Sequence, residues 1–272
     1  MLCAIKSPRL FLTWPIVFAV VLALAPHIAF AHGAGKPAPT FGRVLTAWEP
    51  DPLLFAGVLI AAWAYWSAVR HVNRAHPKAP FPRRRALFFA AGLAVLVLAT
   101  MSPIAAYDGE LLSVHMWQHM LITLAAAPLI LLGTPVTLIL RVASARTRRN
   151  VLLPILHSRV VKALTFPVVA WLALAGTMWL SHFSPFYNAS LENEWLHRFE
   201  HFWYLGAALL FWWPAIGIDP AAWRMNHPIR MLYVFLQNAR PKIRSWAWRF
   251  TARVTSCTTI TRSSNGRGAR LR

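Results

Sequence analysis

The chain has 272 residues, of which 57% are hydrophobic and only 13% are charged, and its mean hydropathy is positive. This balance is too apolar for a soluble domain of such length and predicts a protein of the lipid bilayer. The net charge of +20 does not indicate a nucleic-acid partner, because the basic residues lie in short connections and in the C-terminal tail, with no basic globular domain between them.

The N-terminal segment has the pattern of a secretory signal. Two basic residues, Lys6 and Arg9, precede a hydrophobic run that ends in Ala29-Phe-Ala31, a small-x-small cleavage pattern. We therefore predict a cleaved signal peptide over residues 1–31 and a periplasmic N-terminal segment over residues 32–50. The alternative is an uncleaved anchor helix, which would leave the remaining topology unchanged.

Further along the chain, apolar stretches of membrane-spanning length recur. A hydrocarbon core of about 30 Å requires about 20 apolar residues per helix. Five stretches meet this requirement, at about 51–69, 86–106, 114–140, 164–183 and 199–218. The predicted fold class is all-α, a polytopic transmembrane helical bundle with at least five spans, and its domain covers residues 51–236. Pro128, Gly133 and Pro135 are predicted to break the long third span.

The orientation follows from the basic residues between the spans. Connections 70–85 and 141–162 each carry six Lys or Arg, which predicts that both are cytoplasmic. Segments 107–114 and 184–198 contain acidic residues and only Arg198 as a base, so they are predicted to face the periplasm. We therefore expect a multi-pass protein of the bacterial inner (plasma) membrane, with its mature N-terminus in the periplasm.

The composition changes abruptly near the C-terminus. From Arg240 onward there are nine basic residues and no acidic one, where an alternating topology calls for another span. With ordinary codon choices, the shifted frame beginning at Arg240 encodes Pro-Gln-Asn-Ser-Phe-Leu-Gly-Val-Ala-Ile-Tyr. Our hypothesis is a frameshift near Asn238, which would make residues 237–272 a basic, non-native tail. The alternative is a genuine cytoplasmic tail that binds anionic lipid.

Five of the eleven histidines fall at the predicted periplasmic ends of three spans. They are His115, His119, His182, His197 and His201. Four of them form two pairs at i, i+4, a spacing that places both rings of a pair on one helical face and predicts a shared four-nitrogen shell. Gln118 and Glu200 precede the second histidine of each pair and could orient the rings from the second shell. One such histidine would be an ordinary boundary residue, but five favour a metal or haem site.

The donor types narrow the choice of metal. Imidazole suits copper, zinc, iron and nickel, and the two cysteines, Cys3 and Cys257, lie outside the predicted spans. Met116 and Met120 are possible soft ligands for Cu(I), although methionine also serves as packing filler. Cleavage after residue 31 would make His32 the N-terminus, whose imidazole and amine could chelate copper together. Copper is therefore the predicted cofactor.

Several motifs occur along the predicted spans. They are His115-Met-Trp-Gln-His119 with Pro128-Leu-Ile-Leu-Leu-Gly-Thr-Pro135, Trp179-Leu-Ser-His182-Phe-Ser-Pro185-Phe-Tyr187, His197-Arg-Phe-Glu-His201, Gly206 and Phe211-Trp-Trp-Pro214. Together they resemble the CtaG family of cytochrome c oxidase assembly factors, the polytopic family found with caa-type oxidases. The resemblance covers about residues 50–236 and implies copper delivery to the oxidase, with oxidase subunits and periplasmic copper chaperones as partners. The family normally continues through Pro-Gln-Asn into further helices, from which this sequence departs.

The function predicted from these features is transient copper binding at the outer face of the membrane, without enzymatic catalysis. Because imidazole must be neutral to bind a metal, loading should weaken below roughly pH 6. One alternative is a haem-binding or electron-transfer membrane protein, although two axial ligands need only one histidine per helix. A less favoured alternative is a zinc peptidase, because His197-Arg-Phe-Glu200-His201 matches the pattern His-x-x-Glu-His. The sister pair carries Gln118 instead of a glutamate.

The frameshift hypothesis predicts a specific feature of the gene. An apolar open reading frame must overlap codons 240–262, beginning with Pro-Gln-Asn, and sequencing the gene is the measurement. A gene whose shifted frame is interrupted by a stop codon within those positions would contradict the hypothesis and leave the lipid-binding tail as the better explanation.

Overall fold

A computed structural model describes most of the predicted transmembrane domain. The described residues are 47–107, 112–186, 189–190 and 193–238. Every regular element within these ranges is a helix, which confirms the all-α class. The predicted signal peptide, His32 and the predicted tail from residue 239 lie outside the described residues. The chain forms two compact units, Met1–Arg224 and Met225–Arg272, and each is described by itself.

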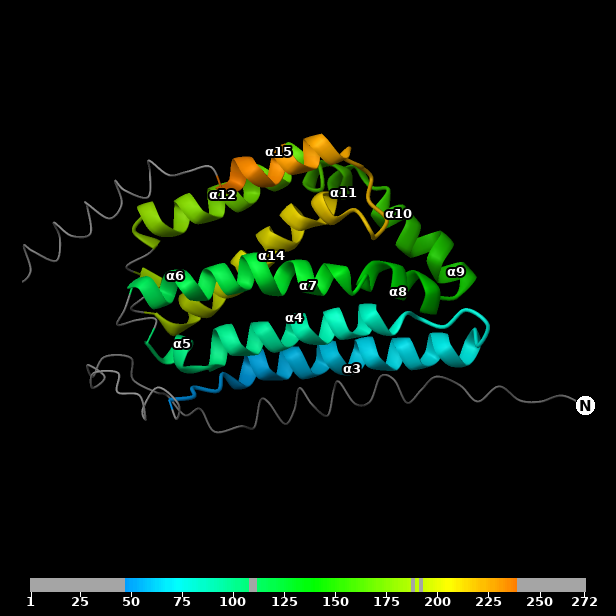
Figure 1. Ribbon diagram of the computed structural model, residues 1–272, viewed down its shortest axis with the longest axis horizontal. Coiled ribbons are helices and arrows are strands. Elements are labelled where there is room, and N and C mark those ends of the chain that lie inside the picture. Colours follow the sequence, from blue (N-terminus) through cyan, green and yellow to red (C-terminus); the bar gives the residue numbers. More distant parts are fainter. Residues whose placement is uncertain (1–46, 108–111, 187–188, 191–192, 239–272) are drawn as a thin grey trace, which may run out of the picture. The chain divides into compact units, whose positions relative to one another are not determined.

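The first unit contains all but one of the described helices. In chain order they are α3 (Pro52–Ala75), α4 (Arg83–Met101), α5 (Pro103–Tyr107), α6 (Leu112–Met120), the π-helix η1 (Leu121–Ala126), α7 (Ala127–Leu132), α8 (Pro135–Val142), α9 (Ala145–Thr147), the π-helix η2 (Arg148–Leu152), α10 (Leu153–Leu156), α11 (Arg159–Leu164), α12 (Pro167–Phe183) and α14 (Glu194–Ile216). Helices α6, η1, α7 and α8 follow one another along the unit (Figure 1). Helix α4 packs against η1 and α7, and α14 packs against α12, α7 and η1. In the second unit, α15 covers His227–Asn238.

By length and composition, three stretches of the described chain could cross a membrane. They are Pro52–Ala75, Arg83–Ala106 and Ser113–Val142, and α12 is a shorter apolar helix. The fifth predicted span coincides with α14, whose Trp, Tyr and His residues lower its hydropathy. The number of spans stays a prediction.

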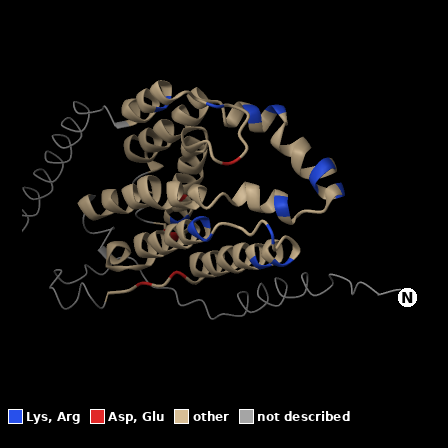
Figure 2. Ribbon diagram, turned by 45° about the vertical axis from the view of Figure 1, so that its right-hand side comes forward, with Lys and Arg blue, Asp and Glu red and all other residues tan. Residues whose placement is uncertain are grey.

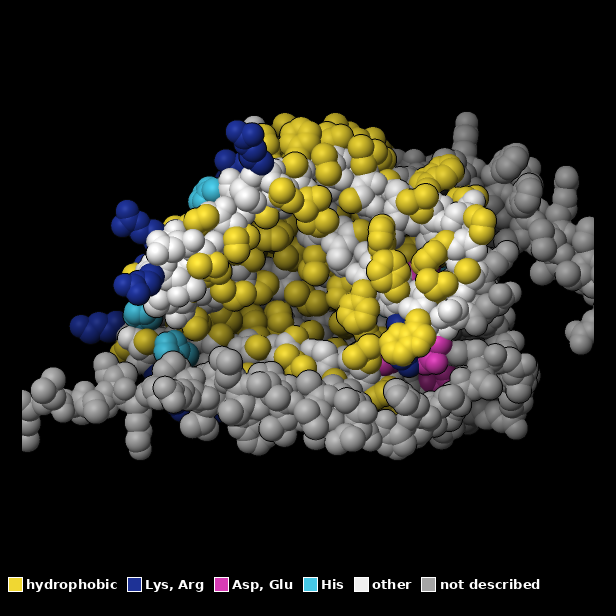
Figure 3. Space-filling model, turned by 180° about the vertical axis from the view of Figure 1, so that it is seen from behind, with side chains coloured by type: hydrophobic (Ala, Val, Ile, Leu, Met, Phe, Trp, Pro, Cys, Tyr) yellow, Lys and Arg dark blue, Asp and Glu magenta, His cyan; other side chains and the backbone are white. Residues whose placement is uncertain are grey.

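Figure 3 shows hydrophobic side chains spread over the face it presents, between the basic groups and the acidic ones, as expected for a surface in contact with lipid.

Charge separates the two ends of the first unit. Figure 2 shows Lys and Arg on the connection between α3 and α4 and along the segment from α8 to α11, whereas Glu49 and Asp51 precede α3 at its other end. The predicted connection 141–162 is largely helical, because it contains α9, η2, α10 and most of α11. Its two caps, Ser144 and Ser158, each accept a hydrogen bond from a backbone N–H three residues later.

A network of caps joins the starts of α3 and α14. The Asp51 carboxylate accepts hydrogen bonds from the backbone N–H groups of Leu53 and Leu54, at 2.9 and 3.1 Å. The Asn193 side chain caps α14 in the same way. Arg198, in the second turn of α14, places its Nε 2.7 Å from the Asp51 carboxylate. The end of the unit that carries the histidines is therefore held by a cap and an ion pair together.

The predicted break in the third span is present. Helix α7 ends at Leu132, Thr134 has a left-handed backbone with φ of 50°, and α8 begins at Pro135, whose fixed φ suits the first turn of a helix. The side chain of Asp219, which follows α14, forms hydrogen bonds with the first turn of α8, directly after this break. Its carboxylate accepts hydrogen bonds from the backbone N–H of Thr137 at 2.9 Å and from the Thr137 hydroxyl at 2.6 Å.

The π-helix η1 begins directly after the first histidine pair, and it leaves a backbone carbonyl that α14 satisfies. The N–H of Ala127 bonds to the Ile122 carbonyl five residues back, so it does not reach the Thr123 carbonyl. The next residue, Pro128, has no N–H to offer. Instead, the indole Nε1–H of Trp212 on α14 donates to the Thr123 carbonyl at 2.8 Å. This bond fixes α14 against the helix that carries the histidine pair.

Trp212→Phe is expected to lower the free energy of unfolding by about 1 to 3 kcal/mol, because it leaves a carbonyl inside the bundle without a donor. The measurement is denaturant unfolding of the full chain in detergent. Trp213→Phe is the matched control, because the Trp213 indole nitrogen has no hydrogen-bond partner among the described residues. Equal losses in the two variants would contradict the role given to the bond from Trp212.

Candidate metal centre

Three helices bring the predicted histidines together. His115 and His119 lie on α6, His182 is in the last turn of α12, and His197 and His201 lie in the first turns of α14. The distances between ring centroids are 4.3 Å for His115–His119, 4.6 Å for His197–His201, 5.8 Å for His115–His197, 6.2 Å for His119–His201, 6.2 Å for His115–His182 and 5.9 Å for His119–His182. The five side chains therefore form one cluster.

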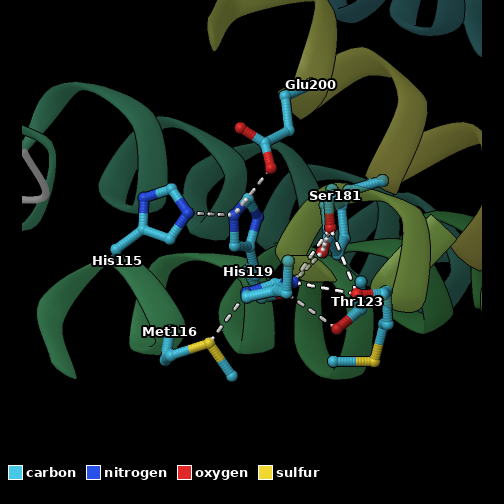
Figure 4. Close-up of polar contacts among 9 residues, drawn as sticks. His115, Met116, His119, Thr123, Ser181 and Glu200 are labelled. Carbon is cyan, nitrogen blue, oxygen red and sulfur yellow. Dashed lines mark hydrogen bonds and ion pairs between the residues drawn. The ribbon is translucent and has the colours of Figure 1, made fainter. Parts of the chain in front are cut away.

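The tightest set of potential ligands within this cluster is His115, His119 and Glu200. The two Nε2 atoms of the histidine pair lie 2.8 Å apart, and the Glu200 carboxylate lies 3.6 Å from His119 Nε2 (Figure 4). One potential ligand atom from each residue lies within 4.8 Å of the other two. None of the three side chains is more than 1% exposed. Two helices thus place two imidazoles and a carboxylate around one buried point.

The chemistry and spacing of these donors fit a metal ion. With metal–nitrogen bonds of about 2.0 to 2.1 Å, two nitrogens at right angles lie about 2.9 Å apart, and in a tetrahedral arrangement about 3.3 Å. The observed 2.8 Å therefore requires ring shifts of only a few tenths of an ångström. Imidazoles with a carboxylate are suitable ligands for copper, zinc or iron. A bound cation would also stabilise the ionised form of a carboxylate in these apolar surroundings.

The second histidine pair lies beside this set. His201 is buried and His197 is half-buried, and neither belongs to the set of residues whose potential ligand atoms lie within 4.8 Å of one another. Glu200, for which the sequence predicted a second-shell role beside a shell of four imidazoles, thus lies with His115 and His119 in a set that could hold a metal ion. The roles of these residues as ligands stay predictions.

The other predicted residues have distinct positions. Gln118 is fully buried, and its side-chain nitrogen donates to the Ala99 carbonyl on α4 at 3.1 Å, so it ties α6 to α4. The Met116 sulfur lies 3.1 Å from His182 Nε2 (Figure 4). Met120 is half-buried at the end of α6. Only Met116, of the two methionines predicted as soft ligands, has a recorded contact with a predicted ligand.

Sequence reasoning did not find Tyr204 and Ser181, which support the cluster. The Tyr204 ring is fully buried and stacks on His119, with centroids 3.9 Å apart and planes inclined by 18°. Its hydroxyl lies 2.5 Å from the Ser181 hydroxyl and 3.2 Å from His182 Nδ1. Tyr204 could have been found from its spacing, because it follows His201 by three residues and so shares its helical face.

Comparison with known proteins identifies similar sequences. The profile of the family described as cytochrome c oxidase caa3 assembly factor matches residues 63–262. Uncharacterized proteins of Mycobacterium bovis (strain ATCC BAA-935 / AF2122/97) and Mycobacterium tuberculosis (strain CDC 1551 / Oshkosh) are each 32% identical to this chain over 203 residues. An uncharacterized protein of Mycobacterium leprae (strain TN) is 30% identical over the same length. No solved structure matches.

The family match covers the helices that carry the cluster. The mycobacterial alignments include 72% of this chain but only 30% of each relative, so the chain spans about a third of the length of the curated relatives it matches. The family match continues past Asn238 into the predicted tail, as far as residue 262. The frameshift stays a prediction.

The contact between the Tyr204 and Ser181 hydroxyls can be tested by a double-mutant cycle. Tyr204→Phe and Ser181→Ala each remove one side of the same hydrogen bond, so each should lower the free energy of unfolding by about 1 kcal/mol. The double variant should lose less than the sum of the two single losses, because the bond between the two hydroxyls can be lost only once. Denaturant unfolding in detergent is the measurement, and additive losses would show that the two hydroxyls act separately.

Proposed function

Because the chain belongs to the family of cytochrome c oxidase caa3 assembly factors, we propose that it binds copper between α6 and α14 and holds the ion for delivery to the oxidase. The observation that carries the proposal is the buried set of His115, His119 and Glu200, whose potential ligand atoms lie within 4.8 Å of one another. Copper is the cargo of this site. The ion would bind, remain shielded from competing ligands and leave.

The choice of copper rests on the donors and on the family. Imidazole and carboxylate donors accept several transition metals, and copper(II) stands at the top of the affinity order for divalent ions. A cytochrome c oxidase contains copper, so an assembly factor with a buried imidazole site has a clear cargo. The partners proposed here are oxidase subunits, which would receive the ion, and periplasmic copper chaperones, which would supply it.

The proposed location is the inner membrane of a bacterium, with the histidine cluster near the periplasmic face. Support comes from the basic residues, which gather at the end of the first unit opposite the cluster, as short cytoplasmic connections do. In this orientation the mature N-terminus is periplasmic. The site would then open toward the side on which an exposed copper centre of the oxidase is assembled.

We propose no catalysis. In the peptidase pattern, His197 and His201 would both bind zinc, and Glu200 would act as a base on a bound water. Instead, the Glu200 carboxylate lies close to His119 of another helix, in the position of a ligand. A carboxylate that binds the metal cannot also act as the base on a metal-bound water.

Haem binding fits the geometry less well. Two axial ligands must approach the iron from opposite sides of a macrocycle. The ring nitrogens of His115 and His119 are only 2.8 Å apart, which leaves no space for a macrocycle between them, and both rings are fully buried. Absorbance of the purified protein in the Soret region would identify a bound haem directly.

Copper quantitation on the purified full chain tests the proposal. The wild type should bind about one copper ion per chain at this site, and the His115→Ala/His119→Ala double variant should lose most of it, because both nitrogen donors are gone. Glu200→Gln, which keeps the shape and removes the charge, should weaken binding by about tenfold or more. Equilibrium dialysis followed by elemental analysis gives both quantities.

The chain offers matched controls. His71→Ala/His157→Ala removes two exposed histidines from the basic end, and Glu194→Gln removes a rim carboxylate that pairs with Arg198. Both should bind copper as the wild type does. Equal copper in the wild type and in the His115→Ala/His119→Ala variant would exclude the site. In cells, the same variant should produce oxidase with less copper, whereas the controls should not.

A further inference from the structure

The connection between α8 and α12 contains a helical arm that packs mainly against itself. This basic arm, residues 145–156, comprises α9, η2 and α10, and none of its residues is buried. Its helices pack mainly against one another and against α11. Figure 1 shows α9 and α10 at the same end of the unit as the connection between α3 and α4. Most residues of the arm are exposed.

Both ends of the basic arm are nevertheless fixed to the bundle. Before the arm, the Arg141 guanidinium donates to the Ala79 carbonyl at 2.6 Å. After it, the Trp223 indole donates to the Lys162 carbonyl at 2.8 Å, and its ring forms a T-shaped contact with Phe166, with centroids 5.1 Å apart. These contacts hold the arm in one place at the end of the unit.

Three arginines occupy the first turns of the arm. Arg146, Arg148 and Arg149 are exposed, and none of them forms an ion pair within the described part of the chain. The sequence contains no Asp or Glu between Glu110 and Glu192, so no carboxylate of the same segment compensates their charge. The planar guanidinium group matches the oxygen atoms of a phosphate. The start of the arm is therefore suited to an anionic, phosphate-bearing partner.

The second half of the arm is apolar and also exposed. Val151 and Ile155, four residues apart on one side of the helix, are 47% and 54% exposed. A helix that combines basic residues with exposed apolar ones is typical of a segment that lies in the membrane interface. The neighbouring segments place the arm at that level, because Ser113–Val142 could cross a membrane and α12 is apolar. In Figure 3, basic side chains project from the edge of a face covered by hydrophobic side chains.

The other basic connection, residues 70–85, is equally charged but is packed onto the bundle. Phe81 is buried, and its backbone N–H donates to the Asn73 side chain at 2.7 Å. The Arg85 guanidinium donates to the Thr134 hydroxyl at 3.3 Å. Positive charge is therefore common to both connections, whereas unpaired arginines beside exposed apolar side chains distinguish the basic arm.

We propose that the basic arm is a binding site for anionic phospholipid. Arg146, Arg148 and Arg149 bind the negatively charged headgroups, and Val151 and Ile155 contact the acyl chains. A zwitterionic lipid has the same phosphate but carries its own cation, so binding depends on anionic lipid. The bound lipid holds the connection between the third predicted span and α12 in the headgroup region. This inference is independent of any metal at the histidine cluster.

A fluorescent probe on the arm tests the proposal. In a Cys3→Ser/Cys257→Ser background, Ile155→Cys is labelled with the environment-sensitive dye nitrobenzoxadiazole. The full chain is placed in nanodiscs of phosphatidylcholine, either alone or mixed with an equal amount of phosphatidylglycerol. The emission should shift to shorter wavelength in the mixed nanodiscs, because the anionic surface draws the arm toward the acyl chains. Added salt should reduce this shift.

Removal of the charges should abolish the response. Arg146→Gln/Arg148→Gln/Arg149→Gln should show the same emission in both kinds of nanodisc. Arg149→Gln alone should raise the phosphatidylglycerol fraction needed for half of the shift, by up to about fivefold.

The chain offers a matched control. Lys78→Gln/Arg83→Gln/Arg84→Gln removes the same number of exposed charges from the other basic connection and should keep the shift. Both triple variants should bind copper as the wild type does, so the result for the arm and the result for the histidine cluster can be distinguished.

Three outcomes would overturn the inference. The first is emission that does not depend on phosphatidylglycerol, including a probe that remains in water in both lipids, as expected if the arm binds an acidic soluble protein instead. The second is a shift that survives the removal of the three arginines of the arm. The third is an equal loss in the control, which would make the response a general effect of charge.

Discussion

A carboxylate and two imidazoles buried between two helices are the constraint around which the rest of the first unit is organised. Glu200 is 1% exposed in a bundle whose other interior side chains are mostly apolar. Ionised groups in such surroundings are stable only when an opposite charge or a metal compensates them. The His119 ring lies 3.6 Å from the Glu200 carboxylate and stacks on Tyr204. The relative position of α6 and α14 therefore decides whether these three side chains meet.

Several polar contacts hold α6 and α14 in place, and each of them joins one of these two helices to a different neighbouring segment. Gln118 forms a hydrogen bond between α6 and α4, and Trp212 forms one between α14 and η1. Arg198, near the start of α14, forms an ion pair with Asp51, which precedes α3. Each contact satisfies a backbone or charged group that would be costly to leave unpaired in an apolar interior. The π-helix is part of this arrangement, because it exposes the Thr123 carbonyl to which Trp212 donates. Sites of function often contain such π turns.

Close packing supports the same region from the side of α4. A Cβ atom at Gly92 would lie 2.8 Å from the backbone nitrogen of Ile130, so only glycine allows α4 and α7 to approach as closely as they do. At the break between α7 and α8, the Tyr65 hydroxyl donates to the Gly133 carbonyl at 2.7 Å. A membrane bundle gains little from the hydrophobic effect between its helices, so small residues and interhelical hydrogen bonds of this kind determine how they associate.

The sequence by itself determined the helical class, the positions of the long helices, the separation of charge between the two ends and the pairing of histidines on helical faces. These properties are local, since they follow from composition and from a repeat of 3.6 residues along one helix. The tertiary structure alone decided that Glu200 faces His119, that Tyr204 and Ser181 lie beneath the histidines, and that Met116 meets His182. The reason is that a periodic pattern defines which residues share a face but not how far each helix is rotated or shifted against its neighbour, and a fraction of a turn decides whether an imidazole or a carboxylate points to the common centre.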